Sequence, residues 1–502
     1  MAAAEKSGVN AREAKSLMAS PGAAAPTGGI LETNKTRVLL LVPDGVGVRN
    51  YLLDHFGRQT SDLLSAAVLT GFDPALLPEQ ARRWPVERFL SFREGPLGAL
   101  LRYAISYAHQ YRWQTHAMRS ILARPVQGSL RKRALHRAAK ALGRFSASGA
   151  GLRALARALE SEISSRPVLR QYADLLRRLQ PDVVFCTHQR PVTVLPVVLA
   201  ARSLGIPTVT FIYSWDNLTS KGRIAAPFDY YFVWSSLMKS ELLRFYPDVR
   251  DNQVVITGTP QFDAYADTSL YVSREEFCRQ VGADPARPLI CYSGGDRTTC
   301  PNEPNQLAVF LELARRGRLN GRPQILFRPS PADEGSRFDR VREAYPELIY
   351  ARPRWRYAPD SNWASNMPTQ EDVQLLVNLV RHADVGVNMA STMTMDFAVF
   401  DKPVVNVAYW SDDPLNLKTA PWLKFYAFEH YRPVVELGAT RVATSADDLA
   451  RHVNEALADP GACARGRQAL LELEMDYEPG GAGRRQAEAL CSIAARRRVV
   501  QA

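Results

Sequence analysis

The sequence contains few cysteines and histidines, and none of them forms a recognisable metal-binding or disulfide pattern. Six cysteines are spread over 502 residues without a CxxC pair, and the eight histidines include no HExxH or HxH arrangement. Three of the cysteines, at positions 186, 278 and 291, lie in apolar strand or helix patterns. This usage is typical of a reduced cytoplasmic protein without structural zinc. We therefore predict no metal site and a cytoplasmic location.

A long hydrophobic run is also missing. A helix needs about 18 consecutive apolar residues to span a bilayer, and the best run, 191–201, has eleven. Residues 1–34 are rich in Ala, Ser, Gly and Pro, and they carry Glu5, Lys6 and Arg12 where a signal peptide would have its apolar core. We expect a disordered leader, on a protein that is neither secreted by a standard signal nor integral to a membrane.

Acidic residues are absent from residues 95–159, although this segment contains twelve lysines and arginines and the whole chain has a net charge of +12. The segment can be a solvated helical region that packs on its own domain. It can instead be a surface for an anionic membrane or an acidic, lipid-linked acceptor, which would make the protein peripheral at the inner face of the plasma membrane. A nucleic-acid surface is the third option. No nucleic-acid motif accompanies the charge, so we predict no nucleic-acid partner.

Continuous apolar runs alternate with helical patterns along most of the chain. The run 37–43 is followed by a glycine turn, DGVG, and by a helical pattern from Tyr51. Such runs are typical of strands that are buried on both faces of a parallel sheet. Further runs occur at 89–92, 181–187, 207–213, 230–234 and 253–257, and a second series occurs at 289–293, 324–329, 348–352, 385–387 and 403–408. We predict an α/β fold with two doubly wound Rossmann-like domains facing across a cleft.

The two series of strands define the expected domain boundaries. After the leader, 1–34, the first domain covers 35–260 and includes a basic helical insertion at about 95–179. A linker is expected at 261–285, and the second domain at 286–480. A last helix is expected at 481–502, and it can return to pack on the first domain.

Glycines, hydroxyls and guanidiniums gather at the predicted strand ends, where ligands bind in sheets of this kind. These residue types suit a phosphorylated ligand. The most informative stretch is 384–407, in which Ser391 and Thr392 open a helix and can present hydroxyls and N–H groups to a pyrophosphate. Asp396 follows four residues later, on the same helix face, where it can hold a ribose hydroxyl. The alternative is a simple helix cap followed by a solvated acid.

Several motifs of the chain resemble the GT-B glycosyltransferases. The motifs SGGDRTT at 293–299, FRPSP at 327–331 and NMASTMTMDFAVFDKPVV at 388–405 are similar to the half that binds the donor. They resemble in particular the relatives that include UDP-N-acetylglucosamine 2-epimerase and the CDP-glycerol glycerophosphotransferases of surface-polymer synthesis. Blocks at 214–222, 232–235 and 254–263 look like those of bacterial surface-polysaccharide glycosyltransferases, and the resemblance covers about 37–60 and 181–410.

The chain departs from these relatives at two positions. Asp396 stands where glutamate is usual, which is a mild change, and Ser330 precedes Pro331 where the glycerophosphotransferases have a histidine.

The resemblance implies that the first domain binds the acceptor and the second binds a nucleotide-sugar donor as co-substrate, with no metal and no cofactor. The residues expected at the donor are Ser293, Gly294, Gly295, Arg297, Arg328, Ser391, Thr392 and Asp396. Those expected at the acceptor or in the cleft are Gly45, Gly47, Trp215, Asn217 and Lys221.

An inverting transfer also needs a base. The candidates at strand ends of the first domain are Asp216, His188 and Asp44. Each has a structural alternative, in which Asp44 starts a turn, His188 caps a helix and Asp216 braces its loop. A retaining enzyme would need no such base.

The predicted function is that of a metal-independent glycosyltransferase, which moves a sugar from a nucleotide sugar to a glycan or lipid-linked acceptor in surface-polysaccharide or glycolipid biosynthesis. A glycerophosphate or polyol-phosphate transferase of surface-polymer synthesis is one alternative. A catalytically silent GT-B scaffold is the other.

Overall fold

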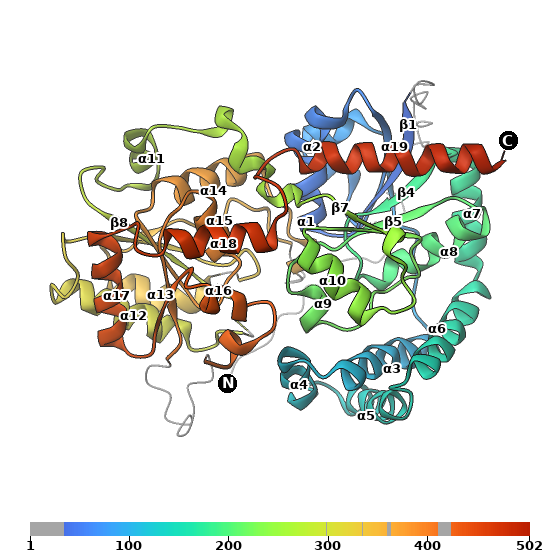
Figure 1. Cartoon of the computed structure of the whole chain (residues 1–502), viewed down its shortest axis with the longest axis horizontal. Helices are drawn as coiled ribbons and strands as arrows, with labels where there is room; N and C mark the ends of the chain where they lie inside the picture. Colours follow the sequence, from blue (N-terminus) through green and yellow to red (C-terminus); the bar gives the residue numbers. More distant parts are fainter. Residues whose placement is uncertain (1–34, 298, 334, 359–362, 410–422, 502) are drawn as a thin grey trace, which may run out of the picture.

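The structure, a computed structural model, describes residues 35–297, 299–333, 335–358, 363–409 and 423–501. These residues form two α/β domains that lie side by side (Figure 1). The leader expected at 1–34 lies outside the described residues. No helix in the described part of the chain is both long enough and apolar enough to cross a membrane.

The first domain is built on a seven-stranded, fully parallel sheet. Its strands are β1 (Thr36–Val42), β2 (Leu64–Thr70), β3 (Val86–Arg88), β4 (Val183–Cys186), β5 (Thr208–Phe211), β6 (Tyr230–Val233) and β7 (Val254–Ile256), in the order β3-β2-β1-β4-β5-β6-β7. The strand expected at 89–92 is wrong, because pairing with β2 ends at Arg88. The sequence analysis also missed β2, whose serine and alanines do not favour a strand.

The second domain contains a six-stranded parallel sheet of the same design. Its strands are β8 (Leu289–Ser293), β9 (Gln324–Arg328), β10 (Ile349–Tyr350), β11 (Val385–Asn388), β12 (Val404–Val407) and β13 (Arg441–Ala443), in the order β10-β9-β8-β11-β12-β13. In both sheets the strand order reverses at the middle, beside β1 and β8. The prediction of two doubly wound domains is therefore confirmed, and their ligand sites are expected at these reversal points.

The strands are buried on both faces, as their apolar runs predict. In the second sheet, Leu289 and Cys291 belong to one core, while Ile290 and Tyr292 belong to another on the opposite face. Alternate side chains of a strand point to opposite faces, so helices must cover both sides of the sheet. The covering helices include α8 (Leu195–Ser203), α10 (Ser236–Phe245), α12 (Glu303–Arg315), α13 (Asp339–Ala344), α14 (Gln370–His382), α15 (Met393–Val399), α16 (Arg432–Glu436), α17 (Ala446–Ala458) and α18 (Ala464–Glu474).

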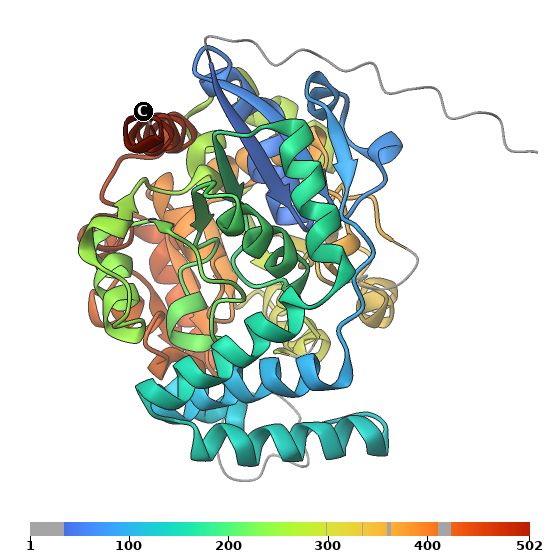
Figure 2. The same ribbon diagram turned by 90° about the vertical axis from the view of Figure 1, so that its right-hand side faces the viewer.

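The basic insertion is helical. It begins with a layer of helices below the first sheet and ends with a helix that lies beside the sheet (Figures 1 and 2). It consists of α3 (Pro96–Trp113), α4 (His116–Ala123), α5 (Leu130–Phe145), α6 (Gly149–Ser164) and α7 (Pro167–Leu179). The helices are interrupted where the sequence has helix-breaking residues, since α4 ends before Pro125 and Ser148 caps α6. A further break occurs at Gln114, which ends α3 in a left-handed conformation.

The chain passes between the domains twice. The first passage contains η7 (Pro260–Ala266), η8 (Thr268–Leu270) and α11 (Arg274–Val281). The second leads from α18 to α19 (Ala482–Gln501), which lies across the first domain against α2 (Asp54–Thr60) (Figure 1). Asp263 of η7 accepts hydrogen bonds from the N–H groups of Ala482 and Gly483, at 3.0 and 2.9 Å. The two passages are thereby joined at the start of α19.

Candidate functional site

A cavity of about 270 Å³ lies between the two domains, and both domains contribute to its wall. The first domain supplies residues from the turn after β1, from the end of β5 and from η7. The second supplies residues from the end of β9, from α14 and from the start of α15. Of the residues predicted from the sequence to bind the donor, Arg328, Ser391, Thr392 and Asp396 line this cavity.

The turn after β11 brings Ser391 and Thr392 to the cavity. Ala390 adopts a left-handed conformation with φ of 42°, and the side chain of Asn388 accepts a hydrogen bond from the N–H of Ser391 at 3.2 Å. The hydroxyl of Thr392 accepts a hydrogen bond from Trp215 Nε1 at 3.2 Å. Trp215 belongs to the first domain, so this contact joins the two predicted motifs across the domain interface.

Asp396 lies deeper in the same wall and is 4% exposed. Its carboxylate accepts a hydrogen bond from the hydroxyl of Tyr265, at 2.5 Å. Burial raises the pKa of Asp396 to about 6, and the Tyr265 hydroxyl and the charge of Arg49 act in the opposite direction. Tyr265 therefore occupies one hydrogen-bonding position of the carboxylate that was expected to hold a ribose.

Two guanidiniums face the cavity. Arg328, at the end of β9, is 5% exposed, and its Nη2 donates to both carboxylate oxygens of Asp372 at 3.0 and 2.9 Å. Its Nη1 is buried and has no hydrogen-bond partner among the described residues. Arg49 forms no ion pair within the described ranges, and its Nε donates to the side chain of Asn50 at 3.1 Å. The cavity thus contains positive charge with unused donors, which is the requirement of an anion site.

Asp372 holds Arg328 in place through further contacts. Besides the guanidinium, it accepts hydrogen bonds from Trp355 Nε1 at 2.7 Å and from the N–H of Arg354 at 2.8 Å. Trp355 and Asp372 both line the cavity. The sequence analysis missed Arg49, Tyr265, Trp355 and Asp372. Of these four, only Arg49 had a sequence feature that pointed to the site, since it lies two residues after the glycine turn at 44–47.

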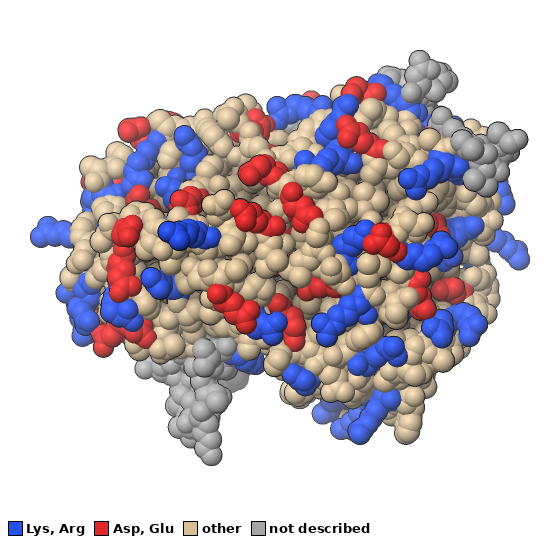
Figure 3. Space-filling model, in the orientation of Figure 1, with Lys and Arg blue, Asp and Glu red and all other residues tan. Residues whose placement is uncertain are grey.

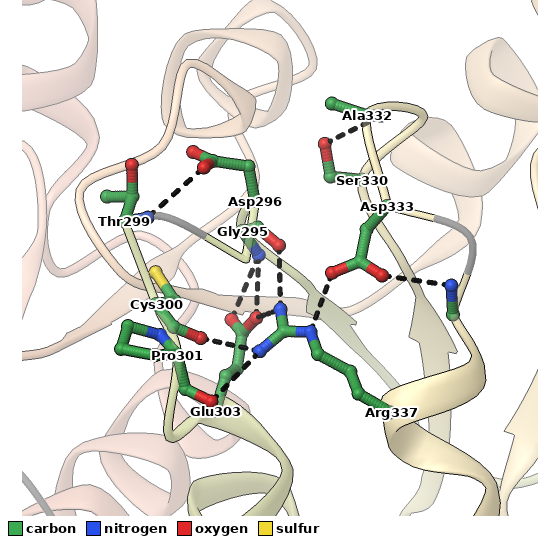
Figure 4. A network of polar contacts seen from close by, with 11 residues as sticks. Gly295, Asp296, Thr299, Cys300, Pro301, Glu303, Ser330, Ala332, Asp333 and Arg337 are labelled. Atoms are coloured by element: carbon green, nitrogen blue, oxygen red, sulfur yellow. Dashed lines mark hydrogen bonds and ion pairs between the residues drawn. The ribbon is translucent and has the colours of Figure 1, made fainter. Parts of the chain in front are cut away.

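The other predicted donor residues lie in the turn after β8 and do not line the cavity. The N–H of Gly295 donates to both oxygens of Glu303, at 3.0 and 2.9 Å, and Glu303 pairs with Arg337 (Figure 4). Ser293 is buried and Arg297 is exposed to solvent. Gly294 donates its N–H to the carbonyl of Arg328. The turn is therefore closed by a carboxylate of the protein itself, in the place where a phosphate was expected.

Asp44 and His188 are brought together because β1 and β4 are neighbours in the sheet. The Asp44 carboxylate is hydrogen-bonded to Nδ1 of His188 and accepts from the N–H of Gly47 at 3.1 Å. Burial acts to raise the pKa of Asp44, but the charge and hydrogen bond of His188 outweigh it and lower the pKa. Nε2 of His188 has no partner among the described residues. The imidazole contacts the Tyr213 ring, at 3.9 Å between ring centroids and 55° between the ring planes, and Tyr213 lines the cavity.

The two glycines of the first turn are required for packing. A Cβ on Gly45 would lie 2.0 Å from the carbonyl oxygen of Asn366 in the second domain. A Cβ on Gly47 would lie 2.6 Å from the hydroxyl of Thr187. Close approach of the two domains explains the first glycine, and close approach of neighbouring strand ends explains the second.

Asp216 is surrounded by donors. It accepts hydrogen bonds from Ser214, Asn217 and Ser220 at 2.6, 2.8 and 2.8 Å, and Lys221 Nζ lies 2.9 Å away. Burial acts to raise its pKa, but Lys221 and the other partners lower it far below the usual range. The side chain of Asn217 also accepts from Gln189, at 2.9 Å. These contacts favour the bracing role for Asp216 and leave Lys221 engaged with it.

No protein-family model matches this sequence, and no curated protein matches it. Among solved structures, the chain is similar to S. aureus MnaA in a structure with UDP, at 13% identity and a TM-score of 0.47, over 89% of this chain and 94% of that chain. It is similar to a glycosyltransferase from Rickettsia africae ESF-5, at 11% identity and a TM-score of 0.49, over 92% and 99% of the two chains. It is also similar to the wall teichoic acid polymerase TagF, at 10% identity and a TM-score of 0.48, over 92% and 90%.

UDP-N-acetylglucosamine 2-epimerases are among the similar structures too. These are the kinds of protein that the sequence motifs resemble. At such low identities and TM-scores the similarity does not establish a family, and the fold assignment rests on the two strand orders.

Proposed function

We propose that the inter-domain cavity binds the diphosphate of a nucleotide sugar. The protein then transfers the sugar to a glycan or lipid-linked acceptor in surface-polysaccharide or glycolipid biosynthesis. The observation that carries this proposal is the pair Arg49 and Arg328, which face one cavity between two doubly wound domains. Asp372 occupies one edge of the Arg328 guanidinium, and the buried Nη1 remains available to a ligand.

Sugar transfer leaves negative charge on the departing diphosphate. Donors that are oriented before the reaction stabilise this charge without reorganising, and a site that excludes water strengthens the effect. Arg328 is oriented by Asp372, which is itself held by Trp355. The hydroxyl of Thr392 accepts from Trp215, so its own proton is directed to another acceptor, for which a phosphate oxygen is suited.

Asp396 is the residue proposed to hold the ribose. Its carboxylate lies in the same wall as Ser391 and Thr392, one helical turn away. A ribose hydroxyl would join or replace the Tyr265 hydroxyl as its hydrogen-bond donor. Since Tyr265 comes from η7, nucleotide binding at this position would be linked to the contact between the domains.

For an inverting reaction, His188 is the proposed base. Asp44 accepts the hydrogen bond of Nδ1, so Asp44 is the positioning residue and Nε2 is the atom that would take the proton. His188 and Asp44 do not line the cavity, whereas Tyr213, which contacts the imidazole, does. The acceptor would therefore bind on the Tyr213 side, and the proposed role requires Tyr213 to move aside so that the acceptor hydroxyl reaches Nε2.

The test is calorimetry with UDP, GDP, CDP and dTDP, followed by titration of inorganic pyrophosphate. The variants Arg328→Gln and Arg49→Gln should weaken both the preferred nucleotide and pyrophosphate by roughly 10- to 100-fold, the usual range for a hydrogen bond to a charged group. Asp396→Asn should weaken the nucleotide only, because pyrophosphate has no ribose.

Arg297→Gln is the matched control, because Arg297 is exposed and lies away from the cavity. It should bind both ligands as the wild type does. Unchanged affinity in Arg49→Gln and Arg328→Gln, with folding verified by circular dichroism, would overturn the proposal. Turnover of CDP-glycerol in place of nucleotide sugars would assign a glycerophosphate or polyol-phosphate transferase, and binding without any turnover would assign a scaffold.

A further inference from the structure

The helix α5 is attached to the protein by one side only. His136, Ala139 and Gly143 form its buried side, against α3. A Cβ on Gly143 would lie 2.8 Å from the carbonyl oxygen of Ala104, so the two helix backbones are in close contact. His136 Nδ1 is 2.7 Å from the hydroxyl of Tyr107. These contacts fix the rotation of α5 about its axis, and therefore determine which residues point outward.

The outward side carries an apolar stripe. Its members recur at intervals of three or four residues, which places them on one face of the helix. They are Leu130, Ala134, Ala138, Ala141 and Phe145, and all are exposed. The two ends of the stripe are large side chains, with Leu130 75% and Phe145 89% exposed. Single exposed apolar side chains are common on protein surfaces, whereas here two large ones and three alanines share one helix face.

Cations flank the stripe. The exposed cations of α5 are Arg131, Lys132, Arg133, Arg137 and Arg144. None of the five has a carboxylate partner in the described part of the chain. Exposed arginines on other helices do have partners, as Arg279 has Glu276 at 2.6 Å and Arg316 has Glu312 at 2.6 Å. The positive charge of α5 is therefore not neutralised within the protein.

The position of α5 leaves this face accessible. In Figure 2, α5 is the outermost helix at the lower end of the insertion, on the side of α3 that faces away from the sheet. Figure 3 shows lysine and arginine side chains along the lower right edge of the molecule, where Figure 1 places α3 and α5. The segment 95–159 contains no acidic residue that could interrupt the positive surface.

We infer that the outer face of α5 binds an anionic lipid bilayer, with the helix axis in the plane of the membrane. Leu130, Phe145 and the alanines between them enter the boundary between headgroups and acyl chains, and the flanking arginines contact lipid phosphates. An exposed apolar stripe between cations fits a bilayer, which offers both environments at one surface. A nucleic acid backbone would use the cations but would leave the stripe in water, and a second copy of this face would be repelled by its charge.

The inference deepens the proposed function, because a lipid-linked acceptor would be presented at the same surface. The insertion is also tied to the candidate site. The hydroxyl of Thr115, which caps α4, donates to the carbonyl of Thr219 at 2.6 Å, and Thr219 follows the loop of Trp215. The N–H of His116 donates to Glu429 of the second domain at 2.7 Å. Both domains therefore contact the helix that precedes α5.

The test is flotation of the full chain with vesicles of phosphatidylcholine alone and with vesicles that also contain phosphatidylglycerol. We expect binding to the anionic vesicles only. Replacing Arg133, Arg137 and Arg144 together by Gln should lower that binding by at least about tenfold, as expected for three surface cations. The double variant Leu130→Ser, Phe145→Ser should also lower it, most clearly at high salt, where screening leaves the apolar contribution dominant.

The matched control replaces Arg279, Arg316 and Arg451 by Gln, which removes the same charge from exposed helices of the second half. It should float as the wild type does. Equal binding to both kinds of vesicle would overturn the inference. The inference would also be overturned if the protein bound a short DNA duplex or polyphosphate more tightly than anionic vesicles, and if that binding were unchanged in the Leu130→Ser, Phe145→Ser variant. Calorimetry of nucleotide binding on the same variants tests the proposed function separately, since α5 lies away from the cavity.

Discussion

At the scale of single residues, the three candidate bases differ in the partners that they already have. Asp216 has four donors around its two oxygens, so it has little capacity to accept a proton. Asp44 is committed to His188 and to the N–H of Gly47. His188 alone retains a nitrogen without a described partner. A general base needs a free lone pair, which favours His188 with Asp44 behind it.

For an inverting reaction, we expect His188→Gln and Asp44→Asn to lower kcat by about 10²- to 10⁴-fold, because proton transfer to a positioned base contributes that much. Donor affinity should not change in either variant. Asp216→Asn should instead lower Tm, because Lys221 would lose its carboxylate partner. Steady-state kinetics and thermal denaturation measure these effects. If Asp216→Asn lost kcat at an unchanged Tm while His188→Gln stayed active, Asp216 and not His188 would be the base.

At the scale of secondary-structure elements, the turn after β8 shows how a phosphate-binding pattern can have a structural use. Its glycines permit tight contacts, but the N–H of Gly295 is taken by Glu303, at the start of α12. Arg337 joins Glu303 and Asp333, and its Nη2 donates to the carbonyl of Gly295 at 3.0 Å (Figure 4). Burial raises the pKa of Glu303 to about 8, opposed by the Gly295 N–H and by Arg337. The network stabilises the turn from within.

Removing Arg337 should destabilise the second domain without affecting the ligand. Arg337→Gln removes the cation that Asp333 and Glu303 share, and breaking a buried ion pair by removing one partner typically costs about 3–5 kcal/mol. Arg315→Gln is the control, because its pair with Glu347 is exposed and such pairs contribute about 0–1 kcal/mol. Urea denaturation measures the difference. If Arg337→Gln weakens nucleotide binding at temperatures where it is folded, the turn belongs to the ligand site after all.

At the scale of the whole molecule, the two domains meet through contacts that include buried carboxyls. Glu474 of α18 is 4% exposed and has no hydrogen-bond or ion-pair partner among the described residues. Burial raises its pKa to about 8, and the charge of Glu241 on α10 adds to the shift. The pKa of Glu241 is also raised to about 8 by burial, with Arg244 opposing and Glu429 adding. Each domain therefore contributes one carboxyl that is protonated near neutral pH.

This arrangement makes the stability depend on pH. An unfolded glutamate titrates near pH 4.3, to a first approximation. The folded state therefore binds more protons between about pH 4.3 and 8, and the free energy of unfolding falls as the pH rises through this window. Glu474→Gln removes one titrating group. Between about pH 5.5 and 8.5 the Tm of this variant should therefore fall less than the Tm of the wild type. At the upper end of this range the variant Tm should exceed the wild-type Tm by about 3 °C or more.

The control for this measurement is Glu472→Gln, which changes an exposed residue of the same helix. Its Tm should follow the wild type at every pH. An unchanged pH profile in Glu474→Gln would mean that this carboxyl does not titrate in the window.

The amino-acid sequence by itself determined most of the architecture. Strands buried on both faces must be continuously apolar, so most of them could be located from their own residues, and their alternation with helices led to two doubly wound domains. Strands were missed or misplaced where local composition is weak, as in β2, or where pairing with a neighbour sets the end, as in β3. The uninterrupted positive charge of 95–159 was also visible without a structure.

The composition of the candidate site was decided by the tertiary structure. Arg49, Tyr265 and Asp396 meet only after the domains are placed against each other, and the contact of Tyr265 with Asp396 joins residues 131 positions apart. The residues 293–297 do not line the cavity, and the N–H of Gly295 is taken by Glu303, which follows the turn in the chain. Local patterns report which groups lie at strand ends, because burial and periodicity are local. Which of those groups keep a free donor depends on partners from distant segments, and those are set by packing.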